Sequence, residues 1–141
     1  MARILVPVDG SASALRALRH AAALAARGRA ELHLLHVLPP MPLYGVVPAT
    51  MHASQYHAAC EALAQKALAP ALRLVRRMRA AHRVHVVYGD PAASIAERAR
   101  RLKCGSIVMG TRGLGAVGSL VLGSVATKVI HLAGAPVTLV K

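Results

Sequence analysis

Five short apolar runs alternate with segments of helical periodicity along this chain of 141 residues, and this alternation constrains the fold most. The runs are continuous in Val, Ile and Leu, which is typical of strands buried on both faces. We expect strands at Arg3–Val8, Glu31–Leu38, Arg83–Tyr88, Ser106–Met109 and Pro136–Val140, and helices at Ser13–Arg27, within His52–Ala81, and at Ala92–Leu102 and Ser124–Leu132. The order βαβαβαβαβ predicts one α/β domain, residues 1–141, with an open parallel sheet and helices on both faces.

Glycine and proline mark the expected helix ends. Gly28 is placed to stop the first helix. Pro70 falls inside the long second helix and has no N–H to donate, so we expect a kink or break near Lys66. Asp90 precedes Pro91 at the start of the third helix, and we interpret Asp90 as a helix cap rather than a metal ligand.

The chain is strongly basic, with 18 Lys and Arg against 5 acids and a net charge of +13. This balance raises nucleic acids and other anionic surfaces as partners. Three tyrosines, no Phe, no Trp and no recognised nucleic-acid motif count against that interpretation, which stays an alternative. The arginines at 73, 76, 77 and 79 are interpreted as a solvated helix face.

The remaining composition points to a cytoplasmic protein outside the membrane. The best uncharged candidate, Gly113–Thr127, is shorter than the roughly 20 apolar residues of a membrane span, and no signal peptide is apparent. Cys60 and Cys104 lack metal-site spacing and suit reduced thiols. His33 with His36, and His82 with His85, are three apart and so face opposite sides of a strand, which argues against shared metal ligation.

A glycine-rich segment after the fourth strand has the character of a phosphate site. Gly113, Gly115 and Gly118 match G-x-G-x-x-G, but no acid follows Glu97 to bind a ribose in the Rossmann manner, and no P-loop lysine is present. Glycine lets backbone N–H groups approach an anion and adopts positive φ without strain, and a helix N-terminus favours negative charge. The alternative is a flexible connection capped by Ser124.

The spacing Gly110-x2-Gly113-x9-Gly123-Ser124 resembles the nucleotide-binding motif of the universal stress protein family, in its ATP-binding branch. The similarity also includes Ile4–Ser11, Ala17-Leu18, Gly89–Pro91, Ile107–Gly113, Leu122–Val125 and Ala135–Val137, and so spans nearly the whole chain. It implies a five-stranded parallel sheet in the order 3-2-1-4-5, a dimer, and ATP between the ends of strands one and four.

The resemblance also implies the binding residues. Pro7, Val8 and Asp9 would contact the adenosine, with Asp9 on the ribose hydroxyls, and Val37 the adenine. The ribose and phosphates would be lined by Met109, Gly110, Arg112 and Gly113, and the triphosphate, with Mg²⁺ or Mn²⁺ bridging its oxygens, would be held by Gly123, Ser124 and Val125. No catalytic residue and no metal ligand from the protein are assigned.

Three positions depart from the family pattern. Ala14 stands where a capping Ser is common, Gly105 where an acid is common, and Gly118-Ser119 where basic residues are frequent. The last departure leaves Arg112 as the only cation of the loop and bears on affinity.

Three functions therefore stand side by side. The first is an ATP-binding regulatory or signalling module of the stress response, the second a slow ATPase or phosphotransferase, and the third a basic nucleic-acid binder. Asp9 could also simply cap the first helix. The apolar final strand has few charges to protect an edge, which predicts a homodimer through that strand.

Overall fold

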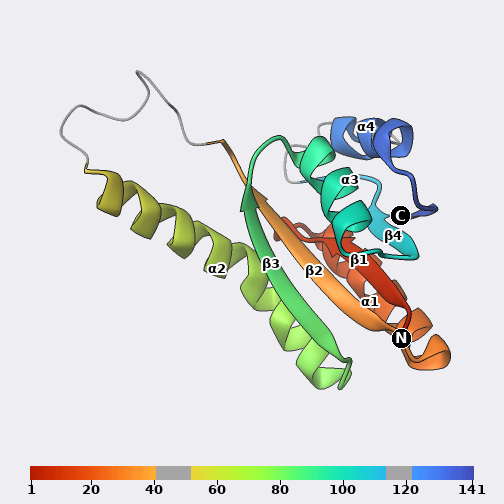
Figure 1. The fold of residues 1–141 in the computed structure, drawn as a ribbon. Helices are drawn as coiled ribbons and strands as arrows, with labels where there is room; N and C mark the ends of the chain where they lie inside the picture. The colour runs from red at the N-terminus through yellow and green to blue at the C-terminus, as the bar shows by residue number, and fades with distance from the viewer. Residues whose placement is uncertain (41–51, 114–121) are drawn as a thin grey trace.

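The computed structural model describes residues 1–40, 52–113 and 122–141, in which strands and helices alternate along the chain (Figure 1). The elements are β1 (Arg3–Pro7), α1 (Ala12–Gly28), β2 (Glu31–Leu38), α2 (Ala53–Arg77), β3 (His82–Tyr88), α3 (Pro91–Arg101), β4 (Ser106–Gly110), α4 (Ser124–Leu132) and β5 (Val137–Val140). Each expected element is present, with its bounds shifted by a residue or a few.

The five strands form one parallel sheet in the order β3-β2-β1-β4-β5, which confirms the predicted fold class. The central strand is β1, whose Leu5 lies opposite His33 of β2 on one side and Ile107 of β4 on the other. The strand order reverses direction at β1. Ligands of open α/β sheets bind outside the carboxyl ends of the strands at such a switch point, here between β1 and β4.

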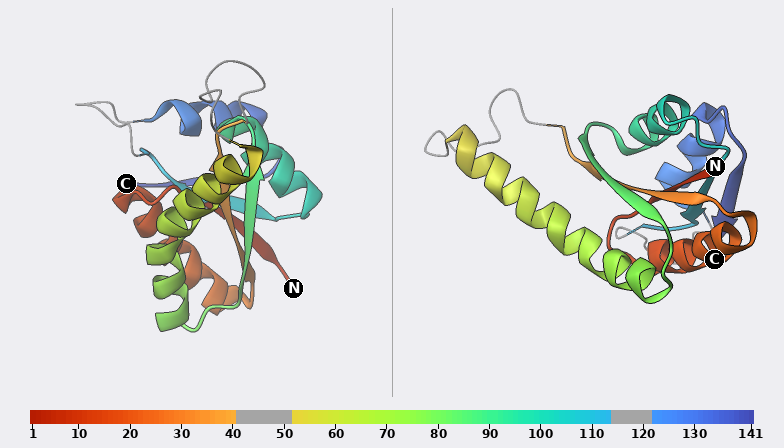
Figure 2. Two further views of the ribbon diagram at one scale, coloured as in Figure 1. Left: turned by 90° about the vertical axis from the view of Figure 1, so that its left-hand side faces the viewer. Right: turned by 60° about the horizontal axis from the view of Figure 1, so that its bottom comes forward.

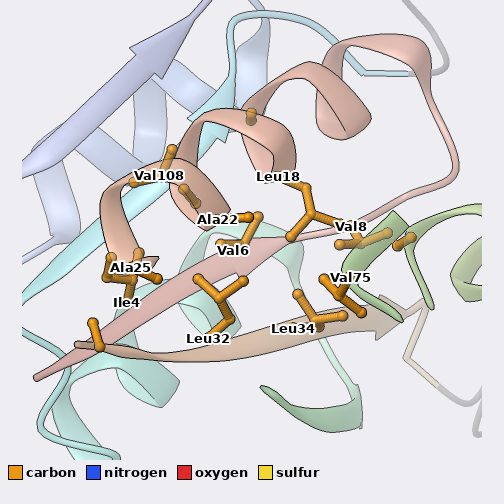
Figure 3. Packing of buried hydrophobic residues seen from close by; sticks show 14 of the residues in the cluster. Ile4, Val6, Val8, Leu18, Ala22, Ala25, Leu32, Leu34, Val75 and Val108 are labelled. Atoms are coloured by element: carbon orange, nitrogen blue, oxygen red, sulfur yellow. The ribbon is translucent and has the colours of Figure 1, made fainter. Parts of the chain in front are cut away.

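Helices cover both faces of the sheet, with α1 and α2 on one face and α3 and α4 on the other (Figures 1 and 2). Successive residues of β1 serve different layers. Val6 packs with Leu18 of α1 and Val75 of α2 (Figure 3), whereas Leu5 packs with Ile95 of α3. This double burial explains why the central strands β1 and β4 are continuous apolar runs, whereas the edge strand β3 is partly exposed and contains His82, Arg83 and His85.

The core is aliphatic, because the sequence holds no Phe or Trp. Small residues compensate for the missing rings, since Ala17, Ala21 and Ala25 place the backbone of α1 close to the sheet. The N-terminal part of α2 extends beyond the sheet (Figures 1 and 2), and among the described residues Cys60 and Ala64 of α2 form a small buried cluster with Leu38.

Two features of the helices differ from expectation. α2 is continuous through Pro70, so of the predicted kink or break near Lys66 the break is absent, and the kink stays a prediction. Lys66 is exposed, and water can therefore take the place of the missing N–H donor. The left-handed residue after α1 is Arg29, with φ 50°, while Gly28 is still helical.

None of the helices among the described residues is long and apolar enough to cross a bilayer.

Candidate functional site

A pocket of about 500 Å³ opens at the carboxyl ends of β1 and β4. Its volume lies within the range of small-molecule and cofactor sites. All eleven residues that the sequence assigned to nucleotide binding line this one pocket: Pro7, Val8, Asp9, Val37, Met109, Gly110, Arg112, Gly113, Gly123, Ser124 and Val125. Their contact with a nucleotide stays a prediction.

Sequence reasoning missed part of the wall. The further lining residues are Ala14, Leu35, His36, Pro91, Ile95, Thr111 and Ala126. Four of these, Ala14, Pro91, Ile95 and Ala126, reach the pocket because their helices pack on the sheet, whereas the other three belong to β2 or follow β4. Three of them, His36, Thr111 and Ala126, lie next to predicted residues, which is the one sequence signal that could have found them.

Asp9 directs one oxygen to the backbone and the other to the glycine loop. Its Oδ1 accepts a hydrogen bond from the Ser11 N–H at 2.9 Å. A Cβ on Gly113 would lie 2.9 Å from Oδ2, so this second oxygen faces the loop. The cap of α1 is Ser11, whose Oγ accepts from the Ala14 N–H at 3.1 Å. The alternative that Asp9 caps this helix is therefore wrong.

The three glycines of the motif are required for close packing. A Cβ on Gly110 would collide with Ser13 Oγ and would lie 2.9 Å from the Ser13 carbonyl carbon. A Cβ on Gly123 would lie 3.2 Å from the carbonyl oxygen of Thr111. Among the described glycines, positive φ occurs at Gly10 and Gly89 and at none of these three. The expectation that the motif needs left-handed backbone is therefore wrong, and steric space is the reason for glycine.

The N-terminus of α4 lacks the side-chain cap that α1 and α3 have. Ser11 caps α1, and Asp90 caps α3 by accepting from the Ala93 N–H at 3.0 Å, which confirms its predicted role. The cap residue of α4 is Gly123, which has no side chain to offer, and Ser124 is the first helical residue. The first-turn N–H groups and the positive end of the helix dipole are thus available at the pocket wall. The alternative of a connection capped by Ser124 is wrong.

His36 fixes one wall of the pocket. It is buried, and its Nδ1 donates a 2.7 Å hydrogen bond to the carbonyl oxygen of Val8. The Val8 N–H in turn donates to the carbonyl of Leu35 at 2.8 Å. These bonds tie the end of β1 to β2 beside Asp9.

The pocket is equipped for binding more than for acid–base catalysis. Asp9, His36 and Arg112 are its ionisable residues among those that the structure describes, and His36 uses one ring nitrogen structurally. Rapid phosphoryl transfer requires a positioned base and a clamp of cations. Gly115, Gly118 and Ser119 of the predicted loop lie outside the described residues.

A polar cluster on the α3 side of β2 and β3 was not predicted. The Nδ1 of His33 lies 2.9 Å from the Nε2 of His85, with the rings stacked, and Glu31 bonds both His33 and Arg83. Burial, reinforced by His33, lowers the pKa of His85, and the Arg83 guanidinium holds the pKa of Glu31 below its ordinary value. Among the described residues no group of three His, Cys, Asp or Glu is placed to hold a metal ion.

The fold and the pocket define a doubly wound α/β protein with a glycine-lined pocket at its switch point. The model of the universal stress protein family matches residues 1–141, and the chain belongs to this family. A universal stress protein of Thermus aquaticus, from the QAH/OAS sulfhydrylase 3′ region, is 41% identical over 138 residues, covering 98% of this chain and 97% of that protein.

Solved structures of the family superimpose over nearly the whole chain. Universal stress protein UspA from Lactobacillus plantarum gives a TM-score of 0.85 at 26% identity, covering 99% of this chain and 97% of that one. The Archaeoglobus fulgidus protein in complex with dAMP gives 0.75 at 26% identity, with 100% and 98% covered. A universal stress protein in complex with cAMP gives 0.74 at 26% identity, with 99% and 97% covered.

Proposed function

We propose that this chain binds ATP in the switch-point pocket and acts as a regulatory module of the stress response, residues 1–141 working as one domain. The observation that carries the proposal is the uncapped N-terminus of α4 behind Gly123, which lines the same pocket as Asp9. The ligands of the solved complexes, dAMP and cAMP, share the adenine base, which favours an adenine nucleotide. Location in the cytoplasm stays a prediction from the sequence.

Each part of the nucleotide has a counterpart in the pocket. Oδ2 of Asp9 is available to accept from ribose hydroxyls, since Oδ1 is already bonded to Ser11. The α4 N-terminus offers N–H groups to the phosphates. Mg²⁺ or Mn²⁺ would be coordinated by phosphate oxygens and water. This fits a pocket in which Asp9 supplies the one carboxylate among the described residues.

The test is calorimetry and thermal melting with ATP, GTP and AMP in the presence of Mg²⁺. ATP should bind once per chain, and at one hundred times Kd it should stabilise the fold by about 2.7 kcal/mol. Gly113→Val with Gly123→Val should abolish binding, because the added side chains meet Asp9 and the Thr111 carbonyl and fill the phosphate approach. The matched control is Gly28→Val with Gly134→Val, where a Cβ meets no atom within 4 Å.

Asp9→Asn is a second variant that keeps the Oδ1 acceptor and should weaken binding without unfolding the chain. A folded double-valine protein that binds ATP like the parent would contradict the glycine-loop assignment. No shift with any nucleotide would contradict the function itself. Release of inorganic phosphate from bound ATP within minutes would favour the slow-ATPase alternative.

We also propose that the chain forms a homodimer through β5, an edge strand of the sheet. The carbonyls of Pro136 and Val140 accept from β4, so the alternate residues Val137 and Leu139 direct their N–H groups away from the sheet. Val137→Pro removes one outward donor and should shift light scattering at tens of micromolar from dimer to monomer. A parent chain that is already monomeric would refute the proposal.

A further inference from the structure

We propose that the end of the molecule opposite the nucleotide pocket binds the phosphodiester backbone of duplex nucleic acid without reading its sequence. This basic end, at the amino edge of the sheet, carries ten exposed cations: Arg3, Arg27, Arg29, Arg76, Arg77, Arg79, Arg83, Arg100, Arg101 and Lys103. They are more than half of the 18 cations of the chain, and two of its five acids, Glu31 and Glu97, lie among them.

Three helices end at this edge in the same way. Each has one residue in the left-handed conformation just after the helix, and the N–H of the next residue donates to the carbonyl oxygen five residues earlier. These bonds run from Ala30 to Ala25 at 3.0 Å, from Ala80 to Val75 at 3.0 Å, and from Cys104 to Ala99 at 2.9 Å. This is the Schellman motif, whose left-handed residue is usually glycine. Here the three left-handed residues are Arg29, Arg79 and Lys103, with φ of 50° to 52°.

Charge compensation of the helix dipoles does not account for these residues. The last turns already contain Arg27 in α1, Arg76 and Arg77 in α2, and three arginines in α3, which supply the charge that a helix carboxyl end favours. Glycine would relieve the steric cost of a left-handed conformation at each position. Each of the three helix ends thus has a cationic residue in a strained, left-handed backbone conformation, which points to an anionic partner that binds these charges.

The sheet holds these cations in fixed order. Backbone bonds join Leu32 to Ala81, Glu31 to Ala2 and Gly105 to Arg3, so the three turns and the start of β1 are neighbours along one edge. In Figure 1 the ends of α1 and α2 and the N-terminus of the chain all lie toward the lower end of the molecule. Three strand spacings of about 4.8 Å cover roughly 14 Å, over which one strand of DNA carries about four phosphates.

The chemistry of this surface favours a duplex over other anions. Nine of the ten cations are arginines, whose planar forks bond phosphate oxygens in a bidentate manner. Single strands are bound by stacking on aromatic rings. The sequence has no Phe or Trp, and the two tyrosines that the structure describes, Tyr56 and Tyr88, lie at the N-terminal part of α2 and the carboxyl end of β3.

The experiment measures fluorescence anisotropy of a labelled 20-base-pair duplex of mixed sequence between 50 and 300 mM NaCl. The variant Arg29→Gly, Arg79→Gly, Lys103→Gly removes three charges while placing glycine where the backbone favours it, so its melting temperature should equal or exceed that of the parent. The slope of log K against log salt should flatten by about 2.7, and affinity at 0.1 M salt should fall roughly 500-fold.

The matched control is Arg19→Gln, Lys66→Gln, Lys128→Gln, which removes the same charge from exposed sites on α1, α2 and α4 away from this edge. It should keep the affinity of the parent within a few-fold. If the glycine variant melts lower than the parent, a second triple variant replaces it: Arg76→Gln, Arg77→Gln, Arg100→Gln. It leaves the left-handed residues unchanged and must show the same loss of duplex affinity.

Four results would overturn the proposal. The first is that the parent does not bind the duplex at 50 mM salt, and the second is that the glycine variant and the control lose duplex affinity equally. The third is displacement of the duplex by saturating Mg·ATP. The fourth is binding to phosphatidylserine vesicles but not to the duplex. The third would place the phosphates in the pocket, and the fourth would make the surface a membrane contact. Double-valine substitution at Gly113 and Gly123 should leave duplex binding unchanged, which keeps this test independent of the proposed ATP function.

Discussion

The contact between Gly110 and α1 makes a quantitative prediction about stability. Gly110 is the last residue of β4, and a Cβ there would lie 2.9 Å from both the carbonyl carbon and the Cβ of Ser13. Ser13 is buried and belongs to the first turn of α1, so it cannot yield without moving the helix. Overpacking of this kind costs about 1–3 kcal/mol. Because backbone atoms are involved, we expect Gly110→Ala to cost about 2–3 kcal/mol.

The assay is urea unfolding followed by circular dichroism, together with thermal melting. For a chain of this length a loss of 2–3 kcal/mol lowers Tm by roughly 6–10 °C. The control is Gly28→Ala, since a Cβ on Gly28 meets no atom within 4 Å and the residue is helical. That change should stabilise the fold by about 0.5–1 kcal/mol.

A double-mutant cycle identifies the contact. Ser13→Gly removes the side-chain half of the collision, so Gly110→Ala should cost at least 0.5 kcal/mol less in that background. Equal unfolding midpoints for Gly110→Ala and Gly28→Ala would refute the packing argument. An unchanged cost in the Ser13→Gly background would show that the strain lies elsewhere.

Three further outcomes follow from the structure. Burial and His33 lower the pKa of His85 below 6.5 in the folded chain, so the unfolded chain takes up the proton first as the pH falls. The free energy of unfolding should therefore decrease as the pH drops from about 6.5 through the pKa of the folded state, and His85→Gln should flatten this part of the profile of Tm against pH. Asp90→Ala removes the cap of α3 and should cost about 1 kcal/mol in urea unfolding, whereas loss of less than 0.3 kcal/mol would contradict the capping role. Burial raises the pKa of the Cys104 thiol, so at pH 8 it should react with a thiol reagent only as fast as the chain opens, and reaction in seconds would contradict its burial.

The fold could be predicted because its signals are local. Each strand is a largely apolar run bounded by turn residues; the runs of β1, β2 and β4 are buried in the sheet, whereas the edge strands β3 and β5 are only partly buried. The pocket could be predicted for a similar reason, since its glycines and Ser124 lie within a short segment after β4 and Asp9 follows β1 directly. Parallel strands bring such segments to one edge whatever the details of packing.

The remaining features depend on distances between residues far apart in the sequence. The His33–His85 contact joins side chains 52 residues apart and requires the register of β2 on β3. Likewise, the pairing of Ser13 with Gly110 requires the depth at which α1 packs on β4. The sequence pattern therefore indicates a nucleotide-binding role for Gly110, although the structure also places Gly110 against Ser13 of α1.

A parallel sheet with antiparallel helices has two chemically different ends, and this asymmetry accounts for both proposed anion sites. At the carboxyl edge α4 begins, its free N–H groups attract phosphate, and Arg112 is the one cation lining the pocket among the described residues. At the amino edge α1, α2 and α3 end, and their carbonyl groups repel anions. Any phosphate held there must be held by side chains, which is why the left-handed positions that need glycine sterically carry Arg29, Arg79 and Lys103 instead. Nucleotide binding should accordingly depend weakly on salt and duplex binding steeply, because the first uses main-chain dipoles and the second releases counterions.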